Sequence, residues 1–344
     1  MSLTIKEQIK ADIIAGNEKI VIKSPAAERL FHETLNENPE IFAYVSGYSA
    51  TPSFFERGLV FNMTYDNMDV QLRNIHYVRS RDALEDIFHA AVSRYLPAII
   101  VVTPPSINVW AAYSDFNVAY GGYYSNHTGT EKRAWSMERG GLSFHRFDFN
   151  YRIGRLKLAM MERDVDKEVA RLEKELFHPE MRPETKAYVA HNYLARTVEY
   201  WLKEDANPLE MSYRQSAYGA LINKKCVCQG YAEAYKRLLD TQGIANYVLC
   251  GKVKASTVHH AWNAVSFNGR DYYHVDVTWD SLGGGLSSQQ YFCKSDDFMR
   301  PTRIWTRRSG VVCPSEENIT KIAKSDIMLN RAKYIRAGID PANF

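Results

Sequence analysis

Three short segments between residues 228 and 279 place a thiol, an imidazole and a carboxylate in one stretch of chain. Cys228 opens the first segment, His260 opens the second, and Asp276 lies in the third. These are the groups of a cysteine nucleophile system, in which the thiol attacks, the imidazole holds its proton and the carboxylate orients the imidazole. The stretch therefore constrains the fold, because this chemistry requires the three side chains to meet.

The residues after Cys228 have the spacing of a helix with one buried face. The apolar positions of this stripe are Tyr231, Ala234, Tyr235, Leu238 and Leu239. Lys236, Arg237 and Asp240 are expected on the exposed face, and Gly243 supplies a C-terminal stop. Cys228 then lies in or just before the first turn, where free N–H groups favour a thiolate and its own N–H can act as an oxyanion donor. A small buried hydrophobe is the alternative interpretation.

The segments that carry His260 and Asp276 are expected to form a β-hairpin around Asn268-Gly269, which is a strong turn signal. Because side chains alternate along strands, His260 and Asp276 share a face only if the connection has an odd number of residues. We therefore expect the three-residue loop Phe267-Asn268-Gly269, with Gly269 in the left-handed conformation and His260 directly opposite Asp276. A regular two-residue turn would separate the pair.

Neighbouring residues offer alternatives to this pair. His274 is expected on the same strand face as Asp276, so it is the main rival imidazole. His260 is preferred because it begins its strand, closer to the end that a helix N-terminus can approach. Asp280 lies past the strand and is expected to begin the loop at 283–285. A lone histidine or aspartate can also be purely structural.

Together these segments resemble the core of the transglutaminase-like superfamily. The family pattern combines C-x-G-Y-A at the start of a helix, G-I, H-A-W-N and D-x-T-W, which begin here at Cys228, Gly243, His260 and Asp276. The resemblance covers about residues 184–306. It implies an α+β fold in which the cysteine-bearing helix packs on an antiparallel sheet, with a papain-like site of nucleophile Cys228, base His260 and orienting Asp276.

The resemblance implies several reactions. Members include cross-linking enzymes, proteases, amidases and proteins without demonstrated catalysis; active members attack an amide carbonyl and form a thioester. Water then gives hydrolysis or deamidation, and an amine gives transamidation. We expect an acyl-transfer enzyme of this kind acting on a peptide or protein, with hydrolysis or deamidation favoured. The alternatives are an inactive binding or scaffold protein and an acyltransferase that uses a carrier thioester, as arylamine acetyltransferases do.

The second oxyanion donor has several candidates. In papain-like sites it comes from a side chain upstream of the cysteine, which here suggests Gln215, Tyr218 or Trp201. Gln229 and Trp262 are further candidates for contact with a substrate. None of the five stands in a pattern specific enough to choose among them.

Composition narrows the remaining possibilities. The net charge of +3 over 344 residues, with scattered basic residues, gives no reason to expect a nucleic-acid-binding surface. An odd count of five cysteines argues against a disulfide framework, and no run approaches the ~20 apolar residues of a membrane span. We expect a cytoplasmic protein that binds neither nucleic acid nor membrane. A removed export signal and the oligomeric state stay open.

No metal ion or other cofactor is expected. Cys226-x-Cys228 lacks a second Cys/His pair at zinc spacing. We find no calcium loop of the D-x-[DN]-x-[DN]-G kind, which favours a metal-free bacterial type of the family.

Two domains are expected, with a junction at His178–Pro183. Residues 1–178 should form a mixed α/β domain of unknown role, and residues 179–344 the transglutaminase-like domain with a C-terminal extension. Within the first domain we expect a strand over 41–48, a pair of strands over 58–64 and 70–78 around Asp66-Asn67, and a turn-rich loop or ragged strands over 122–141.

Overall fold

The computed structural model describes residues 3–120, 127–137, 141–201, 207–254, 258–305, 311–314 and 318–344. By its contacts the chain divides into two compact units. The first comprises Met1–Val92, Leu96–Asp115 and Gly129–Asn150. The second comprises Ser93–Tyr95, Phe116–Thr128 and Tyr151–Phe344. The division near residue 151 lies ahead of the predicted junction at 178–183.

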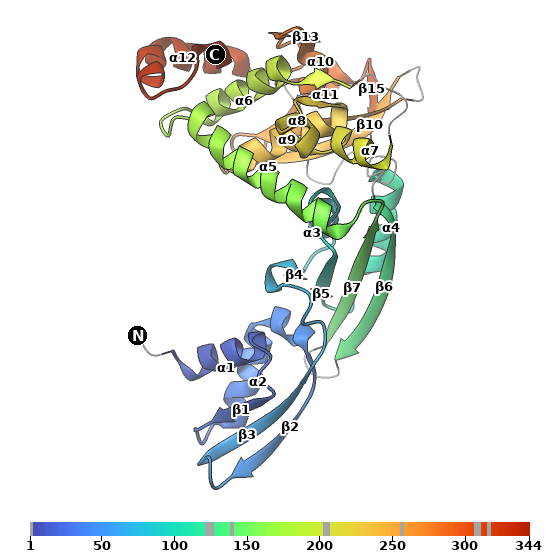
Figure 1. The fold of residues 1–344 in the computed structure, drawn as a ribbon, viewed down its shortest axis with the longest axis vertical. Helices are drawn as coiled ribbons and strands as arrows, with labels where there is room; N and C mark the ends of the chain where they lie inside the picture. Colours follow the sequence, from blue (N-terminus) through green and yellow to red (C-terminus); the bar gives the residue numbers. More distant parts are fainter. Residues whose placement is uncertain are drawn as a thin grey trace. The chain divides into compact units, whose positions relative to one another are not determined.

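The elements up to residue 151 form two sheets with helices (Figure 1). In chain order they are α1 (Ile5–Ile14), β1 (Lys19–Ile22), α2 (Ala27–Glu37), η1 (Pro39–Tyr44), β2 (Val45–Ser53), β3 (Gly58–Tyr65), η2 (Leu72–Asn74), β4 (Ile75–Tyr77), α3 (Asp82–Ser93), β5 (Ala98–Thr103), α4 (Val109–Tyr120), β6 (His127–Met137) and β7 (Leu142–Tyr151). The strand orders are β1-β3-β2 and β4-β5-β7-β6.

Two predictions for this part of the chain need correction. Half of the strand expected over 41–48 is the 3-10 helix η1, in which Ile41–Tyr44 are all buried, while residues 45–48 begin strand β2. Strand β3 pairs with β1 and β2, whereas β4 pairs in parallel with β5, so 58–64 and 70–78 are not partners. Of the two alternatives for 122–141, a loop or ragged strands, the described residues contain strand β6; residues 121–126 and 138–140 lie outside the described part.

The second unit places helices against a four-stranded antiparallel sheet of order β12-β11-β10-β15. Its elements are α5 (Arg155–Leu176), α6 (Pro183–Thr197), β8 (Glu199–Tyr200), α7 (Pro208–Arg214), α8 (Ala217–Leu221), β9 (Lys225–Cys226), α9 (Cys228–Asp240), β10 (Ala245–Val253), β11 (His259–Ser266), β12 (Tyr272–Val275), α10 (Val277–Asp280), β13 (Ser281–Gly283), β14 (Leu286–Ser287), α11 (Asp296–Met299), β15 (Arg303–Trp305), α12 (Ile319–Arg336) and η3 (Pro341–Asn343). This α+β arrangement agrees with the predicted fold class.

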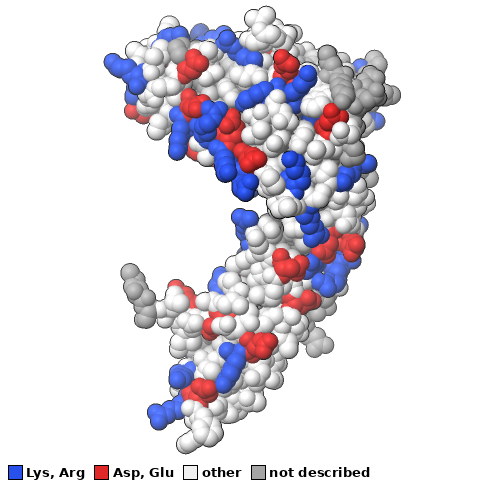
Figure 2. Space-filling view, viewed as in Figure 1, with Lys and Arg blue, Asp and Glu red and all other residues white. Residues whose placement is uncertain are grey.

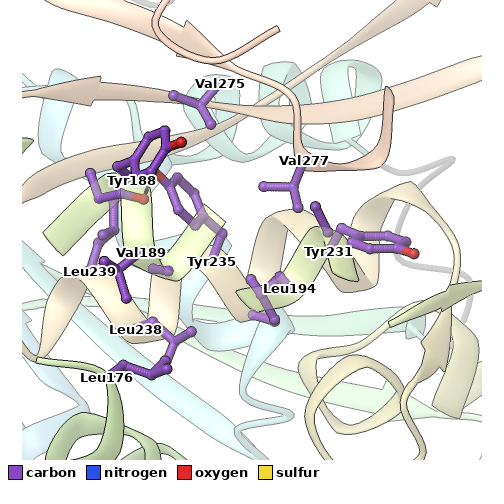
Figure 3. Close-up of a cluster of buried hydrophobic side chains, with 14 of the residues drawn as sticks. Leu176, Tyr188, Val189, Leu194, Tyr231, Tyr235, Leu238, Leu239, Val275 and Val277 are labelled. Carbon is purple, nitrogen blue, oxygen red and sulfur yellow. Dashed lines mark hydrogen bonds between the residues drawn. The ribbon is translucent and has the colours of Figure 1, made fainter. Parts of the chain in front are cut away.

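Helix α9 lies in the core of this unit, and the predicted apolar stripe is its buried face. Figure 3 shows Tyr235 and Leu239 of α9 beside Tyr188 and Val189 of α6. The hydroxyl of Tyr235 donates to the Ala187 carbonyl at 3.1 Å, so this buried phenol keeps a hydrogen bond. The core thus holds α9, and with it Cys228, in a fixed place against the sheet.

One expectation for α9 is wrong: Arg237 is not on an exposed face. It is 6% exposed, and its Nη2 lies 2.7 Å from an Oε of Glu162 in α5. The positive charge is therefore paired inside the unit, as a buried charge must be. The helical spacing predicted the apolar face but not that α5 would cover the opposite one.

The surface in Figure 2 mixes basic and acidic side chains over the visible face, as the net charge of +3 would suggest. Among the described residues, we find no helix that combines the length and the apolar character needed to cross a membrane.

Candidate active site

Cys228 is the first residue of α9. The preceding residue, Val227, is extended, and its carbonyl accepts the N–H of Tyr231 at 3.3 Å. The thiol therefore lies at the end of α9 where the N–H groups of the first turn have no acceptor within the helix. Cys228 is only 8% exposed, so little of it meets solvent.

Close packing explains why the C-Q-G-Y-A motif has a glycine at position 230. A Cβ on Gly230 would lie 2.5 Å from Cβ and 2.8 Å from Sγ of Cys226, and 2.9 Å from the Ser216 carbonyl oxygen. Only glycine allows the chain before α9 to pack this closely against its first turn. Burial raises the pKa of the Cys226 thiol well above its usual value, so Cys226 stays protonated and inert beside Cys228.

The hairpin formed by β11 and β12 has a longer connection than predicted. Ser266 pairs with Tyr272, so the connection has five residues, 267–271, rather than three. The carbonyl oxygen of the Asn268 side chain accepts the N–H groups of Arg270 and Asp271, both at 2.9 Å, and thereby stabilises the longer turn. Five is still an odd number, so His260 and Asp276 remain on the same face.

The position of Asp276 also differs from the prediction. Extending the register beyond Asn263 and Val275 by one pair places Asp276 opposite Trp262, which makes His260 a diagonal neighbour of Asp276. Strand β12 has ended there, and Asp276 is the N-cap of α10, whose Trp279 N–H it accepts at 3.2 Å. A helix cap thus fixes one carboxylate oxygen and leaves the other for the imidazole.

His260 and Asp276 form a buried hydrogen-bonded pair. Nε2 of His260 lies 2.7 Å from Oδ2 of Asp276, and the two residues are 4% and 0% exposed. Because Nε2 faces the carboxylate, Nδ1 is the nitrogen left for the hydrogen bond with the Cys228 side chain. Burial lowers the pKa of His260, but the charge and hydrogen bond of Asp276, together with Cys228, outweigh burial and raise the pKa to about 9. The imidazole is therefore protonated at neutral pH.

Arg303 of β15 is a fourth member of this charge network. Its Nη2 donates to the same Oδ2 of Asp276 that binds His260. The guanidinium is enclosed by rings, 3.9 Å from the centre of Trp279 and 4.7 Å from that of Tyr291. Burial raises the pKa of Asp276, but His260 and Arg303 outweigh it and lower the pKa, so the carboxylate stays charged. Sequence reasoning missed Arg303.

The rival residues His274 and Asp280 have other partners. Nε2 of His274 lies 2.9 Å from an Oδ of Asp296, and its Nδ1 accepts the indole N–H of Trp262 at 2.9 Å. Asp280 binds Nε2 of His191 at 3.0 Å. The geometry therefore favours His260 over His274 as the imidazole beside the thiol.

A family comparison covers the part of the chain that carries these residues. Residues 170–277 match the family model of the transglutaminase-like superfamily, a segment that contains Cys228, His260 and Asp276. Residues 170–277 therefore form a transglutaminase-like core. Arg303 and Asp296 lie beyond the matched segment of this transglutaminase-like core.

Several solved structures are similar to the chain, and no curated protein matches it. One is a TGase at 14% identity and a TM-score of 0.30, covering 76% of this chain and 78% of that one. A candidate cysteine protease from Cytophaga hutchinsonii has 14% identity and a TM-score of 0.29, covering 56% and 68%. A candidate protease from Parabacteroides distasonis has 9% identity and a TM-score of 0.25, covering 56% and 44%. The family match, not these overall similarities, identifies the core.

Trp201, one of the upstream candidates, lies beside the residues that precede Cys228 in the chain. Its N–H donates to the Cys226 carbonyl at 2.8 Å, which places Trp201 alongside the residues that lead into α9. Its indole Nε1 is buried and has no hydrogen-bond partner within the described residues. A buried donor without a partner is costly unless a ligand or water satisfies it.

The other candidates are placed differently. Gln215 ends α7, and Tyr218 of α8 stacks on Tyr213 with ring centres 5.0 Å apart. Gln229 is buried at 4% exposure, with its Oε1 unpaired within the described residues, and not on the surface. Trp262 is 1% exposed, and its indole N–H already donates a hydrogen bond to Nδ1 of His274. Of these, only Gln229 offers an unpaired polar atom next to Cys228.

Tyr200 is a further group near the thiol that sequence reasoning missed. Strand β8 pairs in parallel with β9, so Tyr200 is opposite Cys226. Burial, and then the nearby thiols of Cys228 and Cys226, raise the pKa of Tyr200. It is 44% exposed, so this phenol lies between the solvent and a nearly buried thiol.

Proposed function

We propose that the protein is a thiol acyl-transfer enzyme that acts on an amide of a peptide or protein. The observation that carries this proposal is the contact of His260 with Asp276 at 2.7 Å, with Cys228 at the start of α9 beside the imidazole. A thiol, a base and a group that orients the base are the parts of an activated cysteine nucleophile.

The proposed reaction begins with the proton of Cys228 on His260, which gives a thiolate and an imidazolium. The sulfur attacks the amide carbonyl carbon, and the carbonyl oxygen takes the negative charge of the tetrahedral intermediate. His260 then gives its proton to the leaving nitrogen as the carbon–nitrogen bond breaks, leaving a thioester on Cys228. Water or an amine, deprotonated by His260, attacks the thioester and releases the thiol.

Two donors fit the developing oxyanion in this proposal. The backbone N–H of Cys228 lies in the first turn of α9 and has no intrahelical acceptor. The unpaired indole N–H of Trp201 is the second candidate, because an oxyanion would satisfy it only while the reaction proceeds.

We propose hydrolysis or deamidation as the outcome, since water needs no second binding site. One observation favours a different candidate, an inactive binding or scaffold protein: Cys228 is only 8% exposed, which leaves little room for a substrate. The acyl-transfer proposal is preferred because an inactive scaffold has no use for the buried charge network of His260, Asp276 and Arg303, which costs desolvation energy.

Thiol reactivity tests the proposal. The protein is treated with limiting iodoacetamide near neutral pH, and each cysteine is followed by peptide mass spectrometry. Cys250 is the internal reference, because it is a partly buried cysteine in the same apolar cluster as Cys228. We expect Cys228 to react at least about tenfold faster, because thiolate and not thiol is the nucleophile. Equal rates for the two cysteines would rule out an activated thiol.

A second experiment identifies the reaction. Glutamine-containing peptides are incubated with the protein, with and without a primary amine, and the products are weighed by mass spectrometry. Deamidation, amine addition and cleavage give different masses, and Cys228→Ala should abolish all three. Turnover that survives in Cys228→Ala would assign the activity to another group.

A further inference from the structure

A second buried histidine–aspartate pair lies beside the candidate triad. His274 of β12 and Asp296 of α11 are 1% and 6% exposed, and His274 Nε2 lies 2.9 Å from Asp296 Oδ1. The other ring nitrogen, Nδ1, accepts the indole N–H of Trp262 at 2.9 Å. Both ring nitrogens of His274 take part in these hydrogen bonds, and neither contacts the groups that take part in the proposed reaction.

The indole determines where the proton of His274 lies. An indole nitrogen can only donate, so Nδ1 of His274 must carry the lone pair and Nε2 must carry the proton that is donated to Asp296. Burial lowers the pKa of His274, which keeps the ring neutral at neutral pH and preserves that lone pair. The order of donation is therefore fixed, from Trp262 to His274 to Asp296.

The sulfur of Cys313 lies close to this pair, with the three ligand atoms within 4.8 Å of one another. A histidine, a carboxylate and a thiol are suitable zinc ligands. A metal at Nε2 would need the lone pair of an atom that here carries a proton. As built, the cluster of His274, Asp296 and Cys313 is therefore a hydrogen-bonded support and not a metal site.

Trp262 connects this support to His260. The two rings are stacked, with centres 5.7 Å apart and planes 20° apart. The far edge of the indole is packed tightly: a Cβ on Gly251 would lie 2.8 Å from its Cη2, and the ring of Trp305 meets it edge-on. One end of the indole is thus fixed by a hydrogen bond and the other by close packing.

We propose that His274 is a positioning residue: together with Asp296 it holds the indole of Trp262 flat against His260, so that Nε2 of His260 stays on Asp276 and Nδ1 stays on Cys228. The inference depends on the proposed function only in taking His260 as the base. Loss of the indole hydrogen bond would let the ring tilt, and His260 would gain room to rotate away from the thiol. A base within hydrogen-bond reach is the geometric requirement of this chemistry.

Alkylation of Cys228 tests the proposal without requiring turnover. The rate of reaction with iodoacetamide is measured across a pH series around neutrality, with Cys250 as the internal reference. His274→Leu removes the acceptor for the indole and should slow Cys228 about tenfold, roughly the effect of one hydrogen bond, and shift its pH profile. His274→Gln keeps an acceptor oxygen and should retain most of the rate.

A double-mutant cycle separates positioning from a general loss of structure. Phenylalanine has no N–H to orient, so Trp262→Phe should slow Cys228 by a similar factor. His274→Leu should then add nothing in the Trp262→Phe background. If His274→Leu does not fold, Trp262→Phe alone carries the test.

The outcomes distinguish this inference from the proposed function. A wild-type Cys228 that is no faster than Cys250 contradicts the proposed function. A reactive Cys228 whose rate is unchanged in His274→Leu or Trp262→Phe overturns only the positioning role. Equal slowing by His274→Leu in both backgrounds also overturns it, because His274 would then act independently of Trp262.

Discussion

At the scale of single residues, Asp276 accepts hydrogen bonds from two basic side chains at once. Its Oδ2 accepts hydrogen bonds from His260 and from Arg303, and all three side chains are buried. The carboxylate therefore orients the imidazole while part of its charge is balanced by the guanidinium. Arg303 keeps the buried carboxylate ionised and limits how strongly it holds the proton on His260.

Removing Arg303 should have two measurable effects. Arg303→Met should destabilise the protein by roughly 3 kcal/mol, since breaking a buried ion pair leaves an undercompensated charge. The pH midpoint at which deprotonation of His260 changes the rate of Cys228 labelling should rise. The reason is that the carboxylate of Asp276 would then interact with the imidazole alone. Urea denaturation and the pH series of iodoacetamide labelling measure the two effects.

Arg300→Met is the matched control for Arg303→Met. The Arg300 side chain is 51% exposed, and its ion pairs with Asp296 and Asp297 are at 3.7 and 3.6 Å. Long ion pairs of an arginine that stays in contact with solvent contribute about 0–1 kcal/mol, so the control should be near wild type. Equal stability of the two variants would mean that the contact of Arg303 with Asp276 contributes little.

The sequence predicts the candidate triad residues better than the groups around them. Cys228 lies at the start of a helical pattern, and His260 lies at the start of a strand pattern. The alternation of side chains along the hairpin gives the face on which Asp276 lies. Arg303 and Tyr200 carry no such pattern. Their places depend on β15 pairing with β10 and on β8 pairing with β9, and pairing between distant segments leaves no periodic signal.

At the scale of elements, the hairpin shows what alternation can and cannot predict. Side chains repeat every two residues, so parity predicted that His260 and Asp276 share a face. Connections of three and five residues have the same parity, and alternation cannot choose between them. The choice is made by Asn268, whose side chain accepts two backbone N–H groups and closes the five-residue turn.

Strand β10 makes room for the rings of the site at Gly251. A Cβ there would lie 2.3 Å from the Ile304 carbonyl oxygen, 2.8 Å from Cη2 of Trp262 and 3.0 Å from Cβ of Trp305. Gly251→Ala should therefore push β15 or the indole aside, costing about 1–3 kcal/mol of stability. It should also slow Cys228 alkylation, because Trp262 stacks on His260.

Lys252→Ala is the control on the same strand, because Lys252 is exposed. It should change stability by less than about 0.5 kcal/mol and leave the labelling rate unchanged. Urea denaturation and iodoacetamide labelling of both variants make the comparison. A Gly251→Ala protein as stable and as reactive as Lys252→Ala would show that β15 and the indole can move without cost.

At the scale of the whole molecule, the division of the chain depends on α5. The buried apolar residues of α5 have the spacing of one helix face, but this spacing does not say what that face packs against. Val165, Leu172 and Leu176 lie in the same core as α9, and Glu162 pairs with Arg237. Periodicity identifies a buried face, while its partner is set by contacts that only the folded chain reveals. The division into domains of residues 1–178 and 179–344 stays a prediction.

The raised pKa of His260 should make the stability of the second unit depend on pH. The pKa of His260 is about 9 in the folded protein, whereas the ordinary pKa of a histidine side chain is 6.5. The folded state therefore holds this proton more tightly, so the stabilisation is complete below about pH 6.5 and is lost as the pH rises through 9. The free energy of unfolding should fall by about 3 kcal/mol between pH 6 and pH 9.

Urea denaturation followed by tryptophan fluorescence measures this slope, because Trp201, Trp262, Trp279 and Trp305 all lie in the second unit. His260→Gln is the control: glutamine has no proton to lose in this range, so the variant should lack the His260 step. The informative quantity is the wild-type slope minus that of the variant, because other groups titrate equally in both. Identical slopes would mean that Asp276 does not hold a proton on His260, and the imidazolium of the proposed reaction would lose its support.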